Sequence, residues 1–276
     1  MIYSDLSILL ITIPLGLLVG IATGSVGQTA NALILPLLYI MWEEHILVSI
    51  GASLLIDVIN TAILFVIYGK NKNIKYGVAI LLGSIGAASS LLGSYISFNY
   101  LISLGGALKI LIIIILMISA AIFIRRAFKK RPNIDEIQAK LDAMSLKDFI
   151  SSNKIKSIFI ILVAVIYGFL AGLLGVGGGF VMALLLILLF KMKTIKATGT
   201  GILYMLIMVS VAEIPYIATY PLEISYWGLL FGISAICGTI LSSLIAHRIS
   251  EKKLNLFAGS VLIIFIIIII IQQIFL

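Results

Sequence analysis

Cysteine and charged residues are both scarce in this chain of 276 residues. Cys237 is the single cysteine, which excludes an intrachain disulfide and a metal centre built from several thiolates. Asp, Glu, Lys and Arg make up 11% of the residues, whereas hydrophobic residues make up 62%. Soluble domains carry about 25% charged residues. The composition therefore excludes an ordinary soluble domain.

Charge is missing altogether from four long stretches, 6–42, 157–190, 224–247 and 254–276. About 20 apolar residues form one transmembrane helix, so these stretches hold several crossings. Runs such as 111–117 lack the period-two alternation that a transmembrane β-barrel requires. The sequence predicts an all-α polytopic membrane protein. Because no basic region precedes the first apolar segment, we expect that segment to be retained rather than cleaved.

The basic residues gather in loops between the apolar segments. Lys70, Lys72 and Lys75 form one cluster, and the connection 125–156 carries another. Cytoplasmic loops of membrane proteins are rich in Lys and Arg, which explains the net charge of +8 without nucleic acid. We expect a multi-pass protein of the cytoplasmic membrane with both loops inside. The predicted spans are 6–22, 29–42, 47–69, 76–97, 102–124, 157–175, 179–190, 197–218, 224–246 and 254–274.

The stretch 157–190 is predicted to return to the side on which it starts. Lys191, Lys193 and Lys196 then lie in the cytoplasm, as the charge rule requires. Its two pieces are short for complete spans, so a pair of short crossings and a re-entrant hairpin both remain open.

Glycines recur at corresponding places in the two halves. A shift of 152 residues places Gly27 on Gly179, and a shift of 148 places Gly51 on Gly199. We expect two inverted-topology repeats, each a broken or short helix pair followed by three long transmembrane helices, which is the usual architecture of secondary transporters. The predicted parts are a first repeat at 1–126, a cytoplasmic amphipathic linker at 127–156 and a second repeat at 157–276.

Two glycine-rich breaks interrupt the apolar segments near 24–31 and 175–179. Unwound backbone inside a bilayer is tolerated only against protein or a water-filled cavity. Its free amides can hold an anion, as can the start of the helix that follows. The predicted substrate-binding residues at the breaks are Ser25, Gly27, Gln28, Thr29, Asn31, Gly175, Gly177, Gly178 and Gly179.

Small and hydroxyl residues open the next helix in each half. Their hydroxyls and amides complete the pocket in one interpretation, and serve helix capping and packing in the other. Both interpretations remain open for Ser49, Gly51, Ser53, Thr198, Gly199 and Thr200.

Asp57 lies near the middle of its predicted helix, where an ionisable side chain is costly and usually functional. We regard it as a candidate for coupling transport to a proton or cation, with structural hydrogen bonding as the alternative. Glu213 lies nearer the outer end of its helix, where a vestibule or interfacial position is expected. Lys109 is expected to extend to the interface. No other metal-ligating residue type is placed near His45 in a pattern that would form a metal site.

The motifs resemble those of the TauE/SafE family of sulfite and organosulfonate permeases. The resemblance rests on Gly172-Leu-Leu-Gly175-Val-Gly-Gly-Gly-Phe180, on Ala197-Thr-Gly-Thr200 and on Pro36, and it covers nearly the whole chain. In the first half, polar residues replace the family's glycine run. The resemblance implies transport of a small sulfur-containing oxyanion, driven by an ion gradient.

Motifs of enzymes are absent: no nucleophile with its base, no paired histidines and no nucleotide-binding loop between strand and helix occur. We therefore expect no enzyme, cofactor or metal. The predicted partners are a small anion, membrane lipid and a coupling proton or cation, with the oligomeric state open. The alternatives are a permease for another solute or cation that uses Asp57 and Glu213, and a non-transporting membrane scaffold.

Overall fold

The computed structural model describes residues 5–27, 29–41, 44–100, 144, 146–151 and 154–246, with isolated positions at 117–128 and 248–267. Most of the predicted spans 102–124 and 254–274, most of the linker, Gln28, Lys109 and His247 lie outside them. The described helices are α1 (Asp5–Val26), α2 (Asn31–Pro36), the π-helix η1 (Leu37–Met41), α3 (Ile46–Lys70), α4 (Tyr76–Tyr100), α7 (Leu146–Ser151), α8 (Lys154–Leu174), α9 (Gly179–Phe190), α10 (Thr194–Thr219) and α11 (Pro221–Ala246). No strand occurs among these residues, and the predicted all-α class is confirmed.

Five of the described helices are long and apolar enough to cross a membrane, namely α3, α4, α8, α10 and α11. Their outer faces carry large apolar side chains. On α8, Ile155, Ile158 and Leu162 are 81%, 67% and 54% exposed. Such a surface is unfavourable in water but matches lipid tails. The structure therefore has the character of a multi-pass membrane protein, as predicted.

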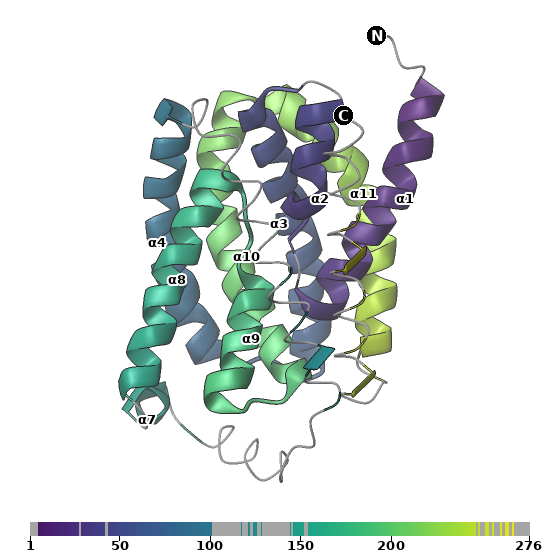
Figure 1. Ribbon diagram of the computed structural model, residues 1–276. Helices are drawn as coiled ribbons and strands as arrows, with labels where there is room; N and C mark the ends of the chain where they lie inside the picture. The colour runs from purple at the N-terminus through teal and green to yellow at the C-terminus, as the bar shows by residue number, and fades with distance from the viewer. Residues whose placement is uncertain are drawn as a thin grey trace.

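The helices form a bundle with two outer pairs and a central group. α1 packs along α11, and α4 packs along α8, while α10 contacts α3, α4 and α9 between them. Figure 1 shows the α4–α8 pair at the left, the α1–α11 pair at the right and α3, α9 and α10 in the middle. Glycines allow both outer pairs to approach closely, because a Cβ on Gly20 would lie 2.0 Å from the Ala235 carbonyl oxygen and one on Gly172 only 1.8 Å from that of Ser90.

Corresponding helix ends lie 148 residues apart in the two halves. α1 ends at Val26 and α8 at Leu174, while α3 begins at Ile46 and α10 at Thr194. Figure 1 shows α1 running down from the N-terminus and α8 running up from α7. The two halves therefore enter their broken segments from opposite directions.

A tyrosine also ties each broken segment to the following long helix. The Tyr68 hydroxyl of α3 donates to the Gly24 carbonyl oxygen at 3.1 Å. In the second half the Tyr216 hydroxyl of α10 donates to the Gly172 carbonyl oxygen. Gly172 and Tyr216 lie 148 residues after Gly24 and Tyr68, so the two hydrogen bonds occupy equivalent places in the two halves.

Thr200 fastens the start of α10 to the turn between α3 and α4. Its hydroxyl donates to the Lys196 carbonyl oxygen at 2.7 Å and accepts from the Lys75 amide at 3.0 Å. Thr200→Val removes the acceptor of a partly buried amide, so we expect a loss of about 1 kcal/mol in the free energy of unfolding. Thermal unfolding in detergent measures it. Thr198→Val is the control, because the Thr198 hydroxyl has no hydrogen-bond partner among the described residues. Equal stability of the two variants contradicts a stabilising role for the hydrogen bond between Lys75 and Thr200.

Candidate substrate site

The two glycine-rich breaks cross in the interior of the bundle. A Cβ atom built on Gly179 would lie 3.0 Å from the Gly27 carbonyl oxygen, and one built on Gly175 would lie 2.8 Å from Asn31 Nδ2. Gly27 thus lies beside the end of the second break, and Asn31 beside its beginning. The segments therefore run antiparallel past each other.

The conformation at each break starts with a glycine in the left-handed region. The φ angles of Gly27 and Gly175 are 75° and 70°, and side chains other than glycine rarely adopt such values. Both amides still donate to the carbonyl oxygen four residues earlier, at 2.8 Å. Gly27 is therefore equivalent to Gly175, at the shift of 148. The alignment of Gly27 with Gly179 made from the sequence differs, because it matched glycines by letter.

Asn31 joins three elements at the crossing. Its Nδ2 donates to Ser53 Oγ of α3 at 3.1 Å and to the Leu174 carbonyl oxygen, the last of α8, at 2.6 Å. Its own amide donates to Thr29 Oγ1 at 3.2 Å. The buried Oδ1 atom has no hydrogen-bond partner in the described part of the chain. Asn31 thus holds the breaks together and leaves one acceptor unused.

Asp57 reaches the first break from the middle of α3. Thr29 Oγ1 donates to its Oδ2 at 2.5 Å, and the Ala30 amide donates to its Oδ1 at 2.7 Å. The side chain is fully buried. A carboxylate therefore occupies the donors of the first break, which the sequence analysis had assigned to the substrate.

The backbone amides of the second break make fewer hydrogen bonds than those of the first. Those of Gly177, Gly178 and Gly179 donate to no acceptor among the described residues, although all three residues are buried. α9 begins here, so the positive end of a helix of 12 residues points at the same place. A Cβ atom on Gly177 would lie 3.1 Å from Asp57 Oδ2. Free donors and the carboxylate are thus direct neighbours.

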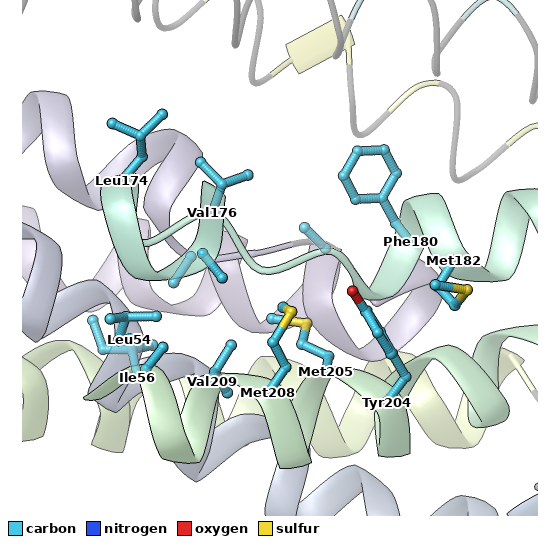
Figure 2. Packing of buried hydrophobic residues seen from close by; sticks show 14 of the residues in the cluster. Leu54, Ile56, Leu174, Val176, Phe180, Met182, Tyr204, Met205, Met208 and Val209 are labelled. Atoms are coloured by element: carbon cyan, nitrogen blue, oxygen red, sulfur yellow. The ribbon is translucent and has the colours of Figure 1, made fainter. Parts of the chain in front are cut away.

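Methionine side chains of α10 fill the space beside these glycines. Figure 2 shows the non-helical connection between Val176 and Phe180 passing over Met205 and Met208. A Cβ atom on Gly177 would lie 2.3 Å from Met205 Cε. Methionine is flexible and readily repacks, so this space can open. Sequence reasoning missed Met205, although it stands 148 residues after Asp57 and so at the equivalent position of its half.

Two other predicted site residues, one from a break and one from a helix opening, have different surroundings. Ser25 is buried in the last turn of α1, where its hydroxyl donates to the Ile21 carbonyl oxygen at 2.7 Å. Ser53 lies at the crossing, because it accepts from Asn31 and lies 3.1 Å from the Cβ position of Gly175. Gln28 lies outside the described residues.

The contacts that place the other residues at the helix openings are with residues outside the two breaks. Ser49 donates to the His45 carbonyl oxygen within its own helix at 3.3 Å. A Cβ atom on Gly51 would meet Tyr216 and Ile224 at 3.0 and 2.3 Å. Thr198, Gly199 and Thr200 lie in the first two turns of α10, where a Cβ on Gly199 would lie 2.1 Å from the Asn73 carbonyl oxygen. Capping and packing account for these positions.

Glu213 is buried on α10, with only 4% of its surface exposed. The vestibule or interfacial position expected from the sequence is therefore wrong. Neither carboxylate oxygen has a hydrogen-bond partner among the residues that the structure describes. In the described part of the chain, each half thus contributes one buried carboxyl group, Asp57 from α3 and Glu213 from α10.

His45 is exposed and has a capping role, since its Nδ1 accepts from the Leu47 amide at 3.3 Å at the start of α3. Within the described residues, no group of three His, Cys, Asp or Glu side chains is arranged to hold a metal ion.

Comparison with known proteins decides the family. The profile of the sulfite exporter TauE/SafE family matches residues 12–269. The chain belongs to the TauE/SafE family. No solved structure matches it significantly.

Members of several lineages resemble it along most of their length. A probable membrane transporter protein of Xylella fastidiosa is 28% identical over 246 residues, covering 89% of this chain and 87% of that protein. The probable membrane transporter protein YjnA of Bacillus subtilis is 25% identical, with 91% and 95% covered. One from Methanocaldococcus jannaschii is 26% identical, with 94% of each chain covered. The resemblance to TauE/SafE proteins inferred from the glycine motifs is confirmed.

Proposed function

We propose that this TauE/SafE protein is a secondary transporter that moves small sulfur oxyanions, such as sulfite or organosulfonates, across the cytoplasmic membrane. The family description and the relatives named as probable membrane transporters support a permease rather than an enzyme. The observation that carries the proposal is the crossing of the two breaks, where the amides of Gly177, Gly178 and Gly179 remain unused inside the bundle.

The crossing has the chemistry that a sulfite or sulfonate group needs. Such a group presents three oxygen atoms on one sulfur and is bound by several convergent donors. Consecutive backbone amides at a helix start supply these donors without bulk, and the helix dipole adds positive potential. Gly177, Gly178 and Gly179 provide this surface in the second half. In the first half, Thr29 donates to Asp57 and Asn31 donates to Ser53 and Leu174, so these side chains hold the crossing in place.

Alternating access is the proposed mechanism, with 1–126 and 157–276 as the two moving halves and 127–156 as a cytoplasmic linker. The repeated shift of 148 and the opposed directions of α1 and α8 support two inverted repeats. Discontinuous helices that meet between such repeats are typical of transporter sites. Because Met205 fills the space beside Gly177, substrate binding requires that its side chain move.

A cation permease is the second candidate, since Asp57 and Glu213 are both buried carboxylates. A substrate panel separates the two. Cation flux depends on these carboxylates, whereas oxyanion flux depends on the glycines. A non-transporting scaffold predicts no flux of any solute.

The test is flux into proteoliposomes that contain the purified protein, with radiolabelled sulfite, methanesulfonate and sulfate. We expect saturable flux of at least one sulfur oxyanion. In Gly177→Ala we expect it to fall about tenfold or more, because the added methyl group occupies the space beside the amides, 3.1 Å from Asp57 Oδ2.

Gly77→Ala is the matched control. A Cβ atom there would lie 3.5 Å from Leu146 Cβ, an ordinary contact, so its flux should equal that of the wild type. Equal flux of Gly177→Ala and the wild type contradicts the proposed site, and flux of other solutes alone contradicts the substrate class.

A further inference from the structure

We infer that each oxyanion is carried together with one proton, and that Asp57 carries this proton. The inference rests on the proposed function. Its basis is that the Asp57 carboxylate lies where an anion is expected, directly beside the free amides of the second break.

Asp57 behaves as an internal anion of the first break. Its two oxygen atoms accept from Thr29 Oγ1 and from the Ala30 amide, just before α2 begins. These donors, a hydroxyl and a backbone amide, are of the kind that bind an ionised carboxyl group. When ionised, this carboxyl group therefore places a negative charge at the crossing.

A second negative charge at the free amides would be strongly repelled. Asp57 Oδ2 lies 3.1 Å from the Cβ position of Gly177. An oxyanion on the Gly177 and Gly178 amides would lie about 5 Å from the carboxylate, and at an effective dielectric constant of about 20 this repulsion weakens binding by about a few hundredfold. Protonation of Asp57 removes this repulsion. Binding of the proton therefore raises the affinity for the anion, and binding of the anion raises the affinity for the proton.

The surroundings of Asp57 favour a proton over a metal cation. A cation such as Na⁺ needs several oxygen acceptors around it. The hydrogen-bond partners of this carboxyl group among the described residues are instead two donors, Thr29 Oγ1 and the Ala30 amide. No Lys, Arg or His among the described residues pairs with it. The buried tyrosines of the surrounding helices do not donate to Asp57. The hydroxyls of Tyr68, Tyr204 and Tyr216 donate to backbone carbonyl oxygens instead. Glu213 lies two turns beyond Met205 along α10.

The proton enters and leaves with the anion. On the side where the site is open, Asp57 takes one proton from water, and the neutral carboxylic acid permits the oxyanion to occupy the amides. After the halves move, the anion leaves, and the carboxyl group returns its proton to water on the other side. No other group gains or loses charge in this cycle.

The experiment measures methanesulfonate and protons together in proteoliposomes of the full-length protein. Methanesulfonate stays an anion across the accessible pH range, so pH acts on the protein and not on the substrate. An internal pH dye counts the protons. For the wild type we expect one proton per anion, and an inward proton gradient should accelerate uptake about tenfold or more.

In Asp57→Asn we expect the response to the gradient to vanish, while exchange of labelled for unlabelled methanesulfonate continues, because asparagine imitates the neutral acid. Glu213→Gln is the matched control and should keep the gradient response. Gradient-driven uptake by Asp57→Asn, or loss of coupling in Glu213→Gln instead, overturns the inference.

The proton count of the wild type decides the question even where Asp57→Asn fails to insert, since anion flux without proton flux overturns the inference. A wild type that carries methanesulfonate without protons leaves the proposed function intact. A wild type that carries no sulfur oxyanion refutes the proposed function itself. The two failures are therefore distinguishable.

Discussion

Replacement of Gly172 by alanine is expected to force α4 and α8 apart and to lower the free energy of unfolding by about 3 kcal/mol. A Cβ atom at this position would lie 1.8 Å from the Ser90 carbonyl oxygen and 2.7 Å from the Ser94 amide nitrogen. Both are backbone atoms of a helix, so no side-chain rotation relieves the contact. The displacement also disturbs the hydrogen bond from the Tyr216 hydroxyl to the Gly172 carbonyl oxygen.

Thermal unfolding in detergent measures this loss, which corresponds to a fall of about 10 °C in Tm. Gly77→Ala serves again as the control, because its Cβ has room and alanine favours a helix over glycine by up to about 1 kcal/mol. Gly20→Ala should behave like Gly172→Ala, since its Cβ would lie 2.0 Å from the Ala235 carbonyl oxygen. A Gly172 variant as stable as the control contradicts the close packing of α4 and α8.

The long helices could be predicted well from the sequence. The spans predicted at 47–69 and 197–218 correspond to α3 and α10, which begin and end within three residues of them. An uninterrupted apolar run needs only hydrogen bonds within itself, so its helix follows from local composition. The same reasoning found the interruptions near Gly27 and Gly175, where glycines permit the left-handed conformation.

Contacts between helices could not be predicted in the same way. The hydropathy pattern gives the depth of Glu213 in the membrane, but its burial depends on how α10 is rotated about its axis. Asp57 contacts Thr29, and Asn31 contacts Leu174, which is 143 residues away. Such pairs depend on packing that no local pattern encodes.

The same limit explains the residues that open α3 and α10. Gly51 and Gly199 resemble a second pair of site glycines in the sequence, but each lies near one end of a long helix. The crossing lies further along both helices, near Ser53 and Met205. Correspondence between repeats shows which positions are equivalent. Only the helix packing shows which of them face the interior.

Replacement of Asn31 by leucine is expected to reduce oxyanion flux by more than about tenfold while the protein remains inserted and folded. Leucine has a similar volume but no donor, so Ser53 Oγ and the Leu174 carbonyl oxygen lose their bonds from Nδ2, which measure 3.1 and 2.6 Å. The buried carbonyl oxygen is left unsatisfied, at a cost of about 1–3 kcal/mol. The change also removes the free Oδ1 from the crossing.

Flux of methanesulfonate into proteoliposomes measures the effect on transport, and thermal unfolding measures the effect on stability. Asn71→Leu is the matched control, because Asn71 is exposed and its Nδ2 donates only to the Ile67 carbonyl oxygen of its own helix at 2.8 Å. Among the described residues, Asn31 is the one side chain whose hydrogen bonds bridge the two breaks, from α2 to the end of α8 and to α3. If Asn31→Leu keeps normal flux, the breaks do not need to be held together for transport, and the substrate must bind away from their crossing.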